Sequence, residues 1–437
     1  MALGGRLAGL VVLGLLLVAL PGGWLAGYFI LLLIALGVDL ALAAAIAPIR
    51  LTRTASAAVR LGETGETVLR LRNTGSRPLR AQVRDAWVPS AGSTPRSHWV
   101  QIPRGEARTL TSALRPTRRG ERPAAQVTIR SFGPLGLAAR QRRVSVPGVI
   151  KVLPAFTSRR FLPEKLSRLR QIDGAVLVHQ RGQGSEFDSL REYVLGDDVR
   201  AIDWRATARS GDVVVRTWRP ERDRRVLIVL DTGRTSAGRV GVDPTASDPG
   251  GWPRLDWSMD AALLLAALAA RAGDHVDFIA HDRVTRTGVY NASRTELLAQ
   301  LVDAMAPLQP ALVESDARAM VAAVQRRIRR RALVVLLTDL NASALDEGLM
   351  AVLPQLSAKH QVLLAAVSDP RVEQLAAGRA DAAQVYDAAA AERARNDRRA
   401  IASRLRRSGV DVVDAPPEEL APELADHYLA MKASGRL

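Results

Sequence analysis

Oxygen-bearing side chains follow two apolar runs in the second half of the chain. Asp231 and Thr235 come after the run 226–230, and Asp339 follows the run 333–337. If both runs are parallel strands, their carboxyl ends meet at one sheet edge, where ligands of open α/β sheets bind. Carboxylates and hydroxyls gathered there could hold a hard cation such as Mg²⁺. The alternative is that Asp231 and Thr235 only cap the next helix.

Other chemistries lack their usual residues. The chain of 437 residues has no Cys and six His, and no His pair has metal-ligand spacing. Disulfides, a thiol nucleophile and Cys-ligated metals are thereby excluded. No strand is followed by a glycine-rich phosphate loop, so the sequence does not favour nucleotide binding.

The region that would position the carboxylates alternates between strands and helices. Its apolar runs are continuous, as is typical of strands buried on both faces. The predicted strands span 226–230, 276–280, 333–337 and 361–367, and the predicted helices span 256–272, 294–305, 316–331 and 345–360. We therefore predict a doubly wound parallel α/β domain over 226–437.

The segment 184–209, inside a linker region that we bound at 156–225, is dense in acids, arginines and aromatic residues. Paired carboxylates could perform acid–base catalysis. The alternative is a network of arginine–carboxylate bonds that fixes an extended segment across the sheet domain. No histidine or other base accompanies the acids, which favours the network.

The segment 51–155 shows a period of two. Apolar and polar residues alternate over 67–72, 81–84 and 127–130, and glycine-containing turns such as Asn73-Thr74-Gly75 separate the runs. Short alternating strands with polar turns predict a small antiparallel β-sandwich. It contains no catalytic set, so we expect a spacer or docking module.

Residues 1–50 predict two transmembrane helices. One spans 24–47, and the other spans 7–20 and can be counted back to Ala2. Pro21-Gly22-Gly23 reads as the turn between them. A cleaved signal peptide is the alternative, but the apolar stretch is too long for one. The single acid, Asp39, is expected to face the partner helix or to lie near the inner interface.

Basic residues predict the orientation and a charged surface. Arg6 precedes the hairpin and Arg50, Arg53 and Arg60 follow it, so we expect the N-terminus and the soluble domains to be cytoplasmic, beneath the cell (inner) membrane. The net charge is +17, and residues 51–150 hold 18 Arg, no Lys and 5 acids. Anionic lipid and nucleic acid are both partners for such a surface. An Arg-rich and Ala-rich composition set by a GC-rich genome explains it equally well.

The dense segment resembles the signature of a bacterial family, the "domain of unknown function 58" family. The pattern is Glu-Phe-x-x-Leu-Arg-Glu-Tyr, then Gly-Asp-Asp-x-Arg-x-Ile-Asp-Trp, then Ala-Thr-Ala-Arg. The resemblance extends over nearly the whole chain, through 119–120, 132–137, 314–316 and 336–340. The matching signature residues are Glu186, Phe187, Leu190, Arg191, Glu192, Tyr193, Gly196, Asp197, Asp198, Arg200, Asp203, Trp204 and Arg209.

This resemblance implies a von Willebrand factor A-like C-terminal domain and a link to MoxR-type AAA+ ATPases. Such domains often bind a metal at an Asp-x-Ser-x-Ser site, completed by a hydroxyl and a distant Asp. The matching residues are Asp231, Thr235, Ser315 and Asp339, whereas Gly233 stands at the middle Ser position and offers no ligand. Mg²⁺ or another divalent cation is the implied ligand of this degenerate site.

We therefore expect a membrane-anchored, non-catalytic protein-interaction or assembly factor that works with a MoxR-type ATPase and has no small-molecule substrate. One alternative is a metal-dependent hydrolase that uses Asp231, Asp339 and Asp203. Another is a membrane protein that binds nucleic acid through its arginine-rich segment 51–150, although few aromatics interleave with the arginines there.

Overall fold

The computed structural model describes residues 2–3, 5–16, 24–179, 186–194, 197–219, 224–242, 251–341 and 348–437. The chain divides into two compact units, Met1–Leu153 and Pro154–Leu437. Each unit has its own buried hydrophobic cluster.

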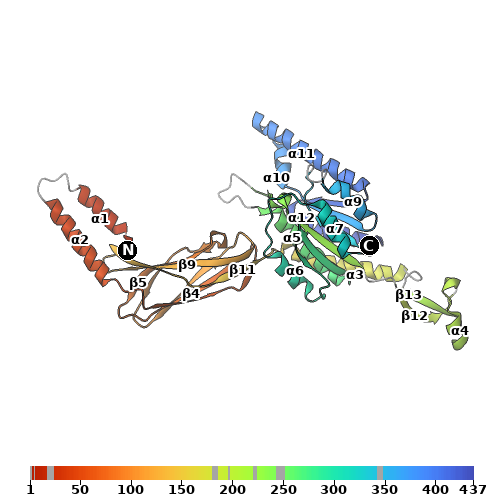
Figure 1. Ribbon diagram of the computed structural model, residues 1–437, viewed down its shortest axis with the longest axis horizontal. Coiled ribbons are helices and arrows are strands. Elements are labelled where there is room, and N and C mark those ends of the chain that lie inside the picture. The colour runs from red at the N-terminus through yellow and green to blue at the C-terminus, as the bar shows by residue number, and fades with distance from the viewer. Residues whose placement is uncertain are drawn as a thin grey trace. The chain divides into compact units, whose positions relative to one another are not determined.

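The N-terminal unit begins with two apolar helices, α1 (Gly5–Leu16) and α2 (Trp24–Leu42) (Figure 1). Within α2, the stretch Leu25–Leu42 is long and apolar enough to cross a membrane. The 19 residues of α2 rise about 28 Å at ~1.5 Å per residue, close to the thickness of a hydrocarbon core. The 12 residues of α1 rise only about 18 Å. The two helices touch where the Tyr28 hydroxyl donates a hydrogen bond to the Leu10 carbonyl at 2.8 Å.

The bounds of both helices differ from the predicted ones, and residues 17–20 of the first predicted helix lie outside the described residues. Ala2 and Leu3 form a strand, β1 (Ala2–Leu3), so the first helix does not extend back to Ala2. The second helix ends at Leu42 instead of Ala47, because Ala44 and Ile46 turn into the core of the β-domain. The predicted turn at 21–23 lies outside the described residues.

Two sheets follow the helices. One has the strand order β2-β4-β8-β6, and the other runs β1-β10-β9-β11-β3, with β5 pairing both β9 and β7. Their pairings are antiparallel except for β11 with β3. The bounds are β2 (Ile49–Ala55), β3 (Ala58–Arg60), β4 (Gly65–Asn73), β5 (Leu79–Trp87), β6 (Ser93–Thr94), β7 (His98–Ile102), β8 (Ala107–Leu114), β9 (Gly120–Phe132), β10 (Ala138–Val144) and β11 (Val149–Leu153).

The period of two places alternate side chains of these strands in one shared core. Leu69 and Leu71 of β4 meet Val83 of β5 and Ile129 of β9 there, while the residues between them face outward. This alternation is what the sequence pattern predicted, because successive side chains of a strand point to opposite faces.

The side chain of Arg53 in this basic domain is buried against an acid. Arg53 pairs with Asp85, with side-chain exposures of 1% and 3%, and its guanidinium lies 5.2 Å from the centre of the Trp87 ring. The charge of Arg53 is therefore neutralised inside the domain and forms no part of its basic surface.

The C-terminal unit is built on a six-stranded sheet with the order β18-β17-β14-β19-β20-β21. All pairings are parallel except that of β18 with β17. The central strands are buried at nearly every residue, which explains their continuous apolar runs. The bounds are β14 (Arg225–Asp231), β17 (His275–His281), β18 (Thr285–Val289), β19 (Leu333–Leu337), β20 (Gln361–Val367) and β21 (Val410–Ala415).

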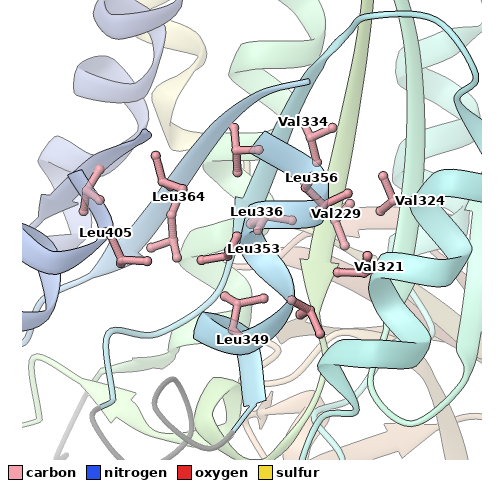
Figure 2. Close-up of a cluster of buried hydrophobic side chains, with 14 of the residues drawn as sticks. Val229, Val321, Val324, Val334, Leu336, Leu349, Leu353, Leu356, Leu364 and Leu405 are labelled. Carbon is pink, nitrogen blue, oxygen red and sulfur yellow. The ribbon is translucent and has the colours of Figure 1, made fainter. Parts of the chain in front are cut away.

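Helices cover both faces of this sheet. Figure 2 shows Val229, Leu336 and Leu364 from the strands packed against side chains of α7, α9 and α11. The alternate residues of β14, such as Ile228, point to the opposite face, on the side of α5 and α12. The helix bounds are α3 (Leu162–His179), α5 (Arg254–Arg271), α6 (Leu297–Met305), α7 (Ala317–Arg327), α9 (Met350–Ser357), α10 (Pro370–Ala377), α11 (Ala382–Arg407) and α12 (Pro417–Ala433).

The predicted boundaries hold better for strands than for helices. The predicted strand 361–367 coincides with β20. Helix α7 ends at Arg327, four residues before its predicted end, because Ile328 is extended and buried. Helix α9 covers only 350–357 of the predicted 345–360, and residues 342–347 lie outside the described part of the chain.

The segment 186–219, which carries the family-like signature, forms a separate arm, called the signature arm. Strands β12 (Glu186–Glu192) and β13 (Val214–Arg219) pair in an antiparallel ladder, and the short helix α4 (Trp204–Ser210) lies between them in the sequence. The sequence predicted an extended segment fixed across the sheet domain, whereas the structure shows a two-stranded ladder within the segment.

Candidate functional site

Asp231 ends the strand at which the sheet order reverses. From β14 the chain proceeds to β17 and β18 on one side, and then to β19, β20 and β21 on the other. The carboxyl ends of β14 and β19 therefore form the switch point at which open α/β sheets bind ligands. Thr338 and Asp339 follow β19 at this same edge.

The carboxylate of Asp231 collects hydroxyl groups from separate loops. Its Oδ1 accepts hydrogen bonds from the Ser315 hydroxyl at 2.5 Å and the Gly233 N–H at 2.8 Å. Its Oδ2 accepts from the Thr338 hydroxyl at 2.7 Å and the Thr235 hydroxyl at 3.4 Å. The structure thus brings together Asp231, Thr235 and Ser315 of the candidate set, with Thr338 as the further member.

Asp339, the fourth candidate, is bound to arginines. Its Oδ1 lies 2.7 Å from Nη1 of Arg398 and 3.6 Å from Nε of Arg254. Arg398 also bonds to Asp414 at 2.6 Å. Burial alone would lower the pKa of Arg398, but the bonds and charges of Asp414 and Asp339 outweigh it and raise that pKa. Arg398 stays charged and neutralises Asp339.

These residues, as they lie, do not fit a divalent-cation site. Mg²⁺ needs near-octahedral oxygen ligands. Both oxygens of Asp231 already accept hydrogen bonds, and Asp339 is paired with arginine. Within the described residues no three acidic or histidine side chains are grouped to hold a metal. A Cβ at Gly233 would lie 2.1 Å from the Ser315 hydroxyl, so the glycine makes room for the bond between Ser315 and Asp231.

The pocket around Asp231 is small. Its volume is about 60 Å³, and its walls include His281, Arg234 and Glu314. Pockets that bind metabolites measure roughly 300–1,000 Å³. Burial lowers the pKa of His281 despite nearby carboxylates, so this imidazole is neutral near pH 7. The pocket can hold water but not a metabolite.

A loop is fastened across this edge by its backbone. The N–H of Ala311 donates to the carbonyl of Thr232 at 2.7 Å, and the N–H of Arg234 donates to the carbonyl of Val313 at 2.8 Å. Between them Leu312 is 80% exposed, and the side chains of Arg234 and Glu314 form an ion pair beside it. The edge therefore presents an apolar side chain with charges next to it.

The acids of the signature arm act within the arm. Asp203 caps α4 by accepting from the N–H groups of Arg205 and Ala206, and it pairs with Arg216 at 2.8 Å. The hydrogen bond from Arg216, together with the backbone donors, lowers the pKa of Asp203. Asp197 pairs with Arg191 at 2.5 Å. Asp198 accepts from the N–H of Arg200 at the start of a 3-10 turn. These bonds form an arginine–carboxylate network within the arm, whereas the sequence predicted a network that fixes the segment across the sheet domain.

The arm also carries exposed apolar side chains. Trp204 is 69% exposed, Val199 62% and Leu190 44%. The exposed signature residues further include Glu192, Arg200 and Arg209, while the N–H of Tyr193 bonds to the carbonyl of Val213. The side chains of Glu186 and Phe187, and all of Gly196, lie outside the part of the chain that is described.

Sequence reasoning missed Arg398, Arg254 and Asp414. They lie far along the chain from Asp339, and nothing in their neighbourhood marks them as its partners. Thr338 was visible as the residue before Asp339, but the sequence did not indicate which of the two would turn toward Asp231.

Comparison with known proteins now identifies the family. The family described as "Protein of unknown function DUF58" matches residues 189–410, half of the chain. The chain belongs to this family. The match includes most of the signature arm and the sheet domain up to the start of β21.

The curated relatives of this DUF58 chain are uncharacterized. It is 28% identical over 197 residues to proteins of Mycobacterium bovis and Mycobacterium tuberculosis, which covers 44% of this chain and 58% of theirs. It is 24% identical over 139 residues to YeaD of Bacillus subtilis, which covers 32% of this chain and 35% of that protein. The chain thus spans less than two thirds of these relatives.

Solved structures give partial likenesses. A CARDB domain from Pyrococcus furiosus is 17% identical, covers 22% of this chain and 86% of its own, and has a TM-score of 0.17. A FixG-related protein from Vibrio parahaemolyticus is 9% identical, covers 24% and 96%, and has a TM-score of 0.18. At such scores neither likeness bears on function.

Proposed function

We propose that this DUF58 protein is a membrane-anchored, non-catalytic interaction or assembly factor that works with a MoxR-type AAA+ ATPase. The observation that carries the proposal is the signature arm. A two-stranded sheet is marginally stable in water by itself. This one leaves Trp204, Val199 and Leu190 exposed within one short arm, which makes the arm a candidate surface for contact with a partner. Tryptophan is also among the residues enriched at the energetic hot spots of protein interfaces.

The sheet edge supports binding rather than catalysis. The four hydrogen bonds to Asp231 leave it poorly placed to act as a base, and the pocket of about 60 Å³ admits no metabolite. The strand order and the antiparallel edge strand β18 support a von Willebrand factor A-like arrangement. We propose that the face near Leu312 acts without a divalent cation.

The anchor in this proposal is the pair α1 and α2, placed as a hairpin with both soluble units on the cytoplasmic side. The apolar stretch Leu25–Leu42 and the contact between the helices support it. The chain has no cysteine, so Ser76→Cys gives one label site on an exposed turn of the β-domain. We expect an impermeant maleimide to label it only after the inner membrane is opened. Labelling in intact spheroplasts would show that the β-domain lies outside the inner membrane and would refute this orientation.

Site-specific cross-linking tests the partner. A photo-reactive phenylalanine analogue replaces Trp204 in the full chain within its native membrane, and cross-linked proteins are identified by mass spectrometry. A MoxR-type ATPase is the expected product. The matched control places the analogue at Tyr386, which is 78% exposed on α11. Tyr386 lies 12 residues from Arg398, about 18 Å along the helix at ~1.5 Å per residue.

The products separate the outcomes. Cross-links from position 204 only to this same chain would show that the arm packs on its own sheet domain, and the arm would lose its role as a partner surface. Equal capture from positions 204 and 386 would show non-specific proximity. Capture of a different protein from position 204 alone would refute the ATPase as partner while keeping an interaction role.

A further inference from the structure

A second, larger pocket lies in the N-terminal unit, beside the start of α1. Its volume is about 580 Å³, within the range of ligand pockets. Three arginines line it, Arg6, Arg80 and Arg130, and all three are exposed. No acidic side chain is among its described lining residues. The pocket is therefore roomy and strongly cationic.

This pocket is held at the base of the apolar helices. Its wall includes Gly133, Pro134 and Gly136, from the loop that joins β9 to β10. Arg6 of α1 donates to the carbonyl of Leu135 in that loop at 3.1 Å. From α2, the buried carboxylate of Asp39 accepts from the N–H of Leu135 at 2.8 Å. The loop is thus fixed to both helices, and the pocket stays beside the start of one and the end of the other.

The remaining groups in the pocket suit an amphipathic ligand. Trp99 is 68% exposed, and its ring lies 5.1 Å from that of Phe132. Tryptophan at the foot of a membrane helix favours the headgroup level of a bilayer. The side-chain amides of Gln82 and Gln101 add neutral donors for hydroxyl groups. Arg130 donates a hydrogen bond from its Nε to the side-chain oxygen of Gln141 at 2.8 Å, so this bond does not use its Nη groups.

We propose that this pocket binds the phosphodiester headgroup of an acidic phospholipid. Arginine forks bind phosphate oxygens, and basic pockets beside membrane helices on the cytoplasmic side hold acidic headgroups. The proposal rests on the membrane anchoring proposed above. A free phosphate shares the same chemistry, but only a lipid adds acyl chains that continue beside α1. The position at the foot of both apolar helices favours the lipid over a nucleic acid.

The test measures lipid retained by the purified full chain. The protein is delipidated in detergent, offered equal amounts of phosphatidylglycerol and phosphatidylcholine, and examined by native mass spectrometry. We expect one phosphatidylglycerol to be retained in preference to phosphatidylcholine. The double variant Arg80→Gln/Arg130→Gln should retain it at least tenfold less. The matched control is Arg70→Gln/Arg72→Gln, two exposed arginines of the other sheet, which should behave as wild type.

Four results would overturn the proposal: equal retention of both lipids, an equal loss in the control variant, displacement of the lipid by inorganic phosphate, or its displacement by a single-stranded oligonucleotide. Circular dichroism of each variant checks that the β-domain is folded. If a glutamine pair unfolds it, Arg80→Lys/Arg130→Lys keeps the charge but removes the guanidinium forks. This folded variant should retain less phosphatidylglycerol than wild type, and wild-type retention would overturn recognition by arginine forks. Failure of the membrane-anchor proposal is distinguishable from failure of the lipid-pocket proposal. If the chain is not anchored, cell fractionation will recover it outside the membrane.

Discussion

Asp39 gives the sharpest test of how the apolar helices are joined to the β-domain. Its carboxylate is fully buried and accepts four backbone hydrogen bonds from consecutive residues. The donors and distances are Leu135 at 2.8 Å, Gly136 at 3.3 Å, Leu137 at 2.7 Å and Ala138 at 3.1 Å. Oδ1 serves the first two donors and Oδ2 the last two, so both oxygens are needed.

Replacing Asp39 by Asn keeps the shape and removes half of the acceptors. One oxygen remains, and the new NH₂ group points at two N–H donors. Two bonds to a charged acceptor are lost, each worth about 1.5–3 kcal/mol, and the buried donors gain no water in exchange. Relaxation of the loop recovers part of this loss, so we expect the loop to be destabilised by about 3 kcal/mol. That corresponds to roughly 100-fold more frequent opening.

Hydrogen exchange of the full chain in detergent measures this opening locally. In Asp39→Asn, the amides of 135–138 should exchange roughly 100-fold faster, while those of β4 keep their wild-type rates. Asp85→Asn is the matched control, because Asp85 is also buried in this unit but pairs with Arg53. It should leave the amides of 135–138 unchanged. A change of less than about threefold in Asp39→Asn would refute the reasoning, since the loop would then be held by the β9–β10 pairing alone.

Three further predictions concern the sheet domain. Gly233→Ser should lower the melting temperature by overpacking, because its Cβ would lie 2.1 Å from the Ser315 hydroxyl. The expected loss of stability is about 1–3 kcal/mol. Adding Ser315→Gly should recover part of that stability, and calorimetry that shows additive losses for the two substitutions would contradict this. Burial holds the pKa of His281 below 6.5, so the stability from its neutral form is complete above pH 6.5 and is lost as the pH falls below 6.5 toward the folded-state pKa. In urea melts at a series of pH values, His281→Gln should flatten the plot of unfolding free energy against pH below 6.5. An unchanged slope of that plot would contradict the prediction. Arg398→Met should lower the free energy of unfolding by about 3 kcal/mol, because it leaves the buried Asp339 carboxylate without its main partner. Adding Asp339→Asn to this variant should restore part of that free energy in the same melts. If nothing is restored, the loss comes from packing and not from the unpaired charge.

The sheet of the C-terminal unit was readable from the sequence because its strands are buried on both faces. Runs such as 361–367 contain little else than apolar residues, and each coincides with a central strand. Alternation with helices then implies parallel pairing, and parallel pairing brings Asp231 and the residues after β19 to one edge. Hydrophobic periodicity thus predicted where the candidate residues meet.

The partners of those residues were not readable in the same way. Arg398 lies on α11, a helix of 26 residues with several other arginines, and only the packing of that helix selects which one turns toward Asp339. The partners of Asp39 are backbone N–H groups almost one hundred residues away. Every residue except proline has a backbone N–H donor, so the pattern of residue types does not indicate which N–H groups bind a given carboxylate.

Asp231 and Asp39 lead to the same conclusion about buried carboxylates in this chain. Each stood out in the sequence, one as a metal ligand and one as an acid inside an apolar helix. Each is instead satisfied by neutral donors, hydroxyl groups around Asp231 and N–H groups around Asp39. A carboxylate satisfied in this way fixes loops to its own element, because both of its oxygens accept hydrogen bonds from those loops. The exposed groups proposed to recognise something outside the chain are therefore other side chains: Leu312 beside this edge, Trp204 of the signature arm and the arginines of the pocket beside α1.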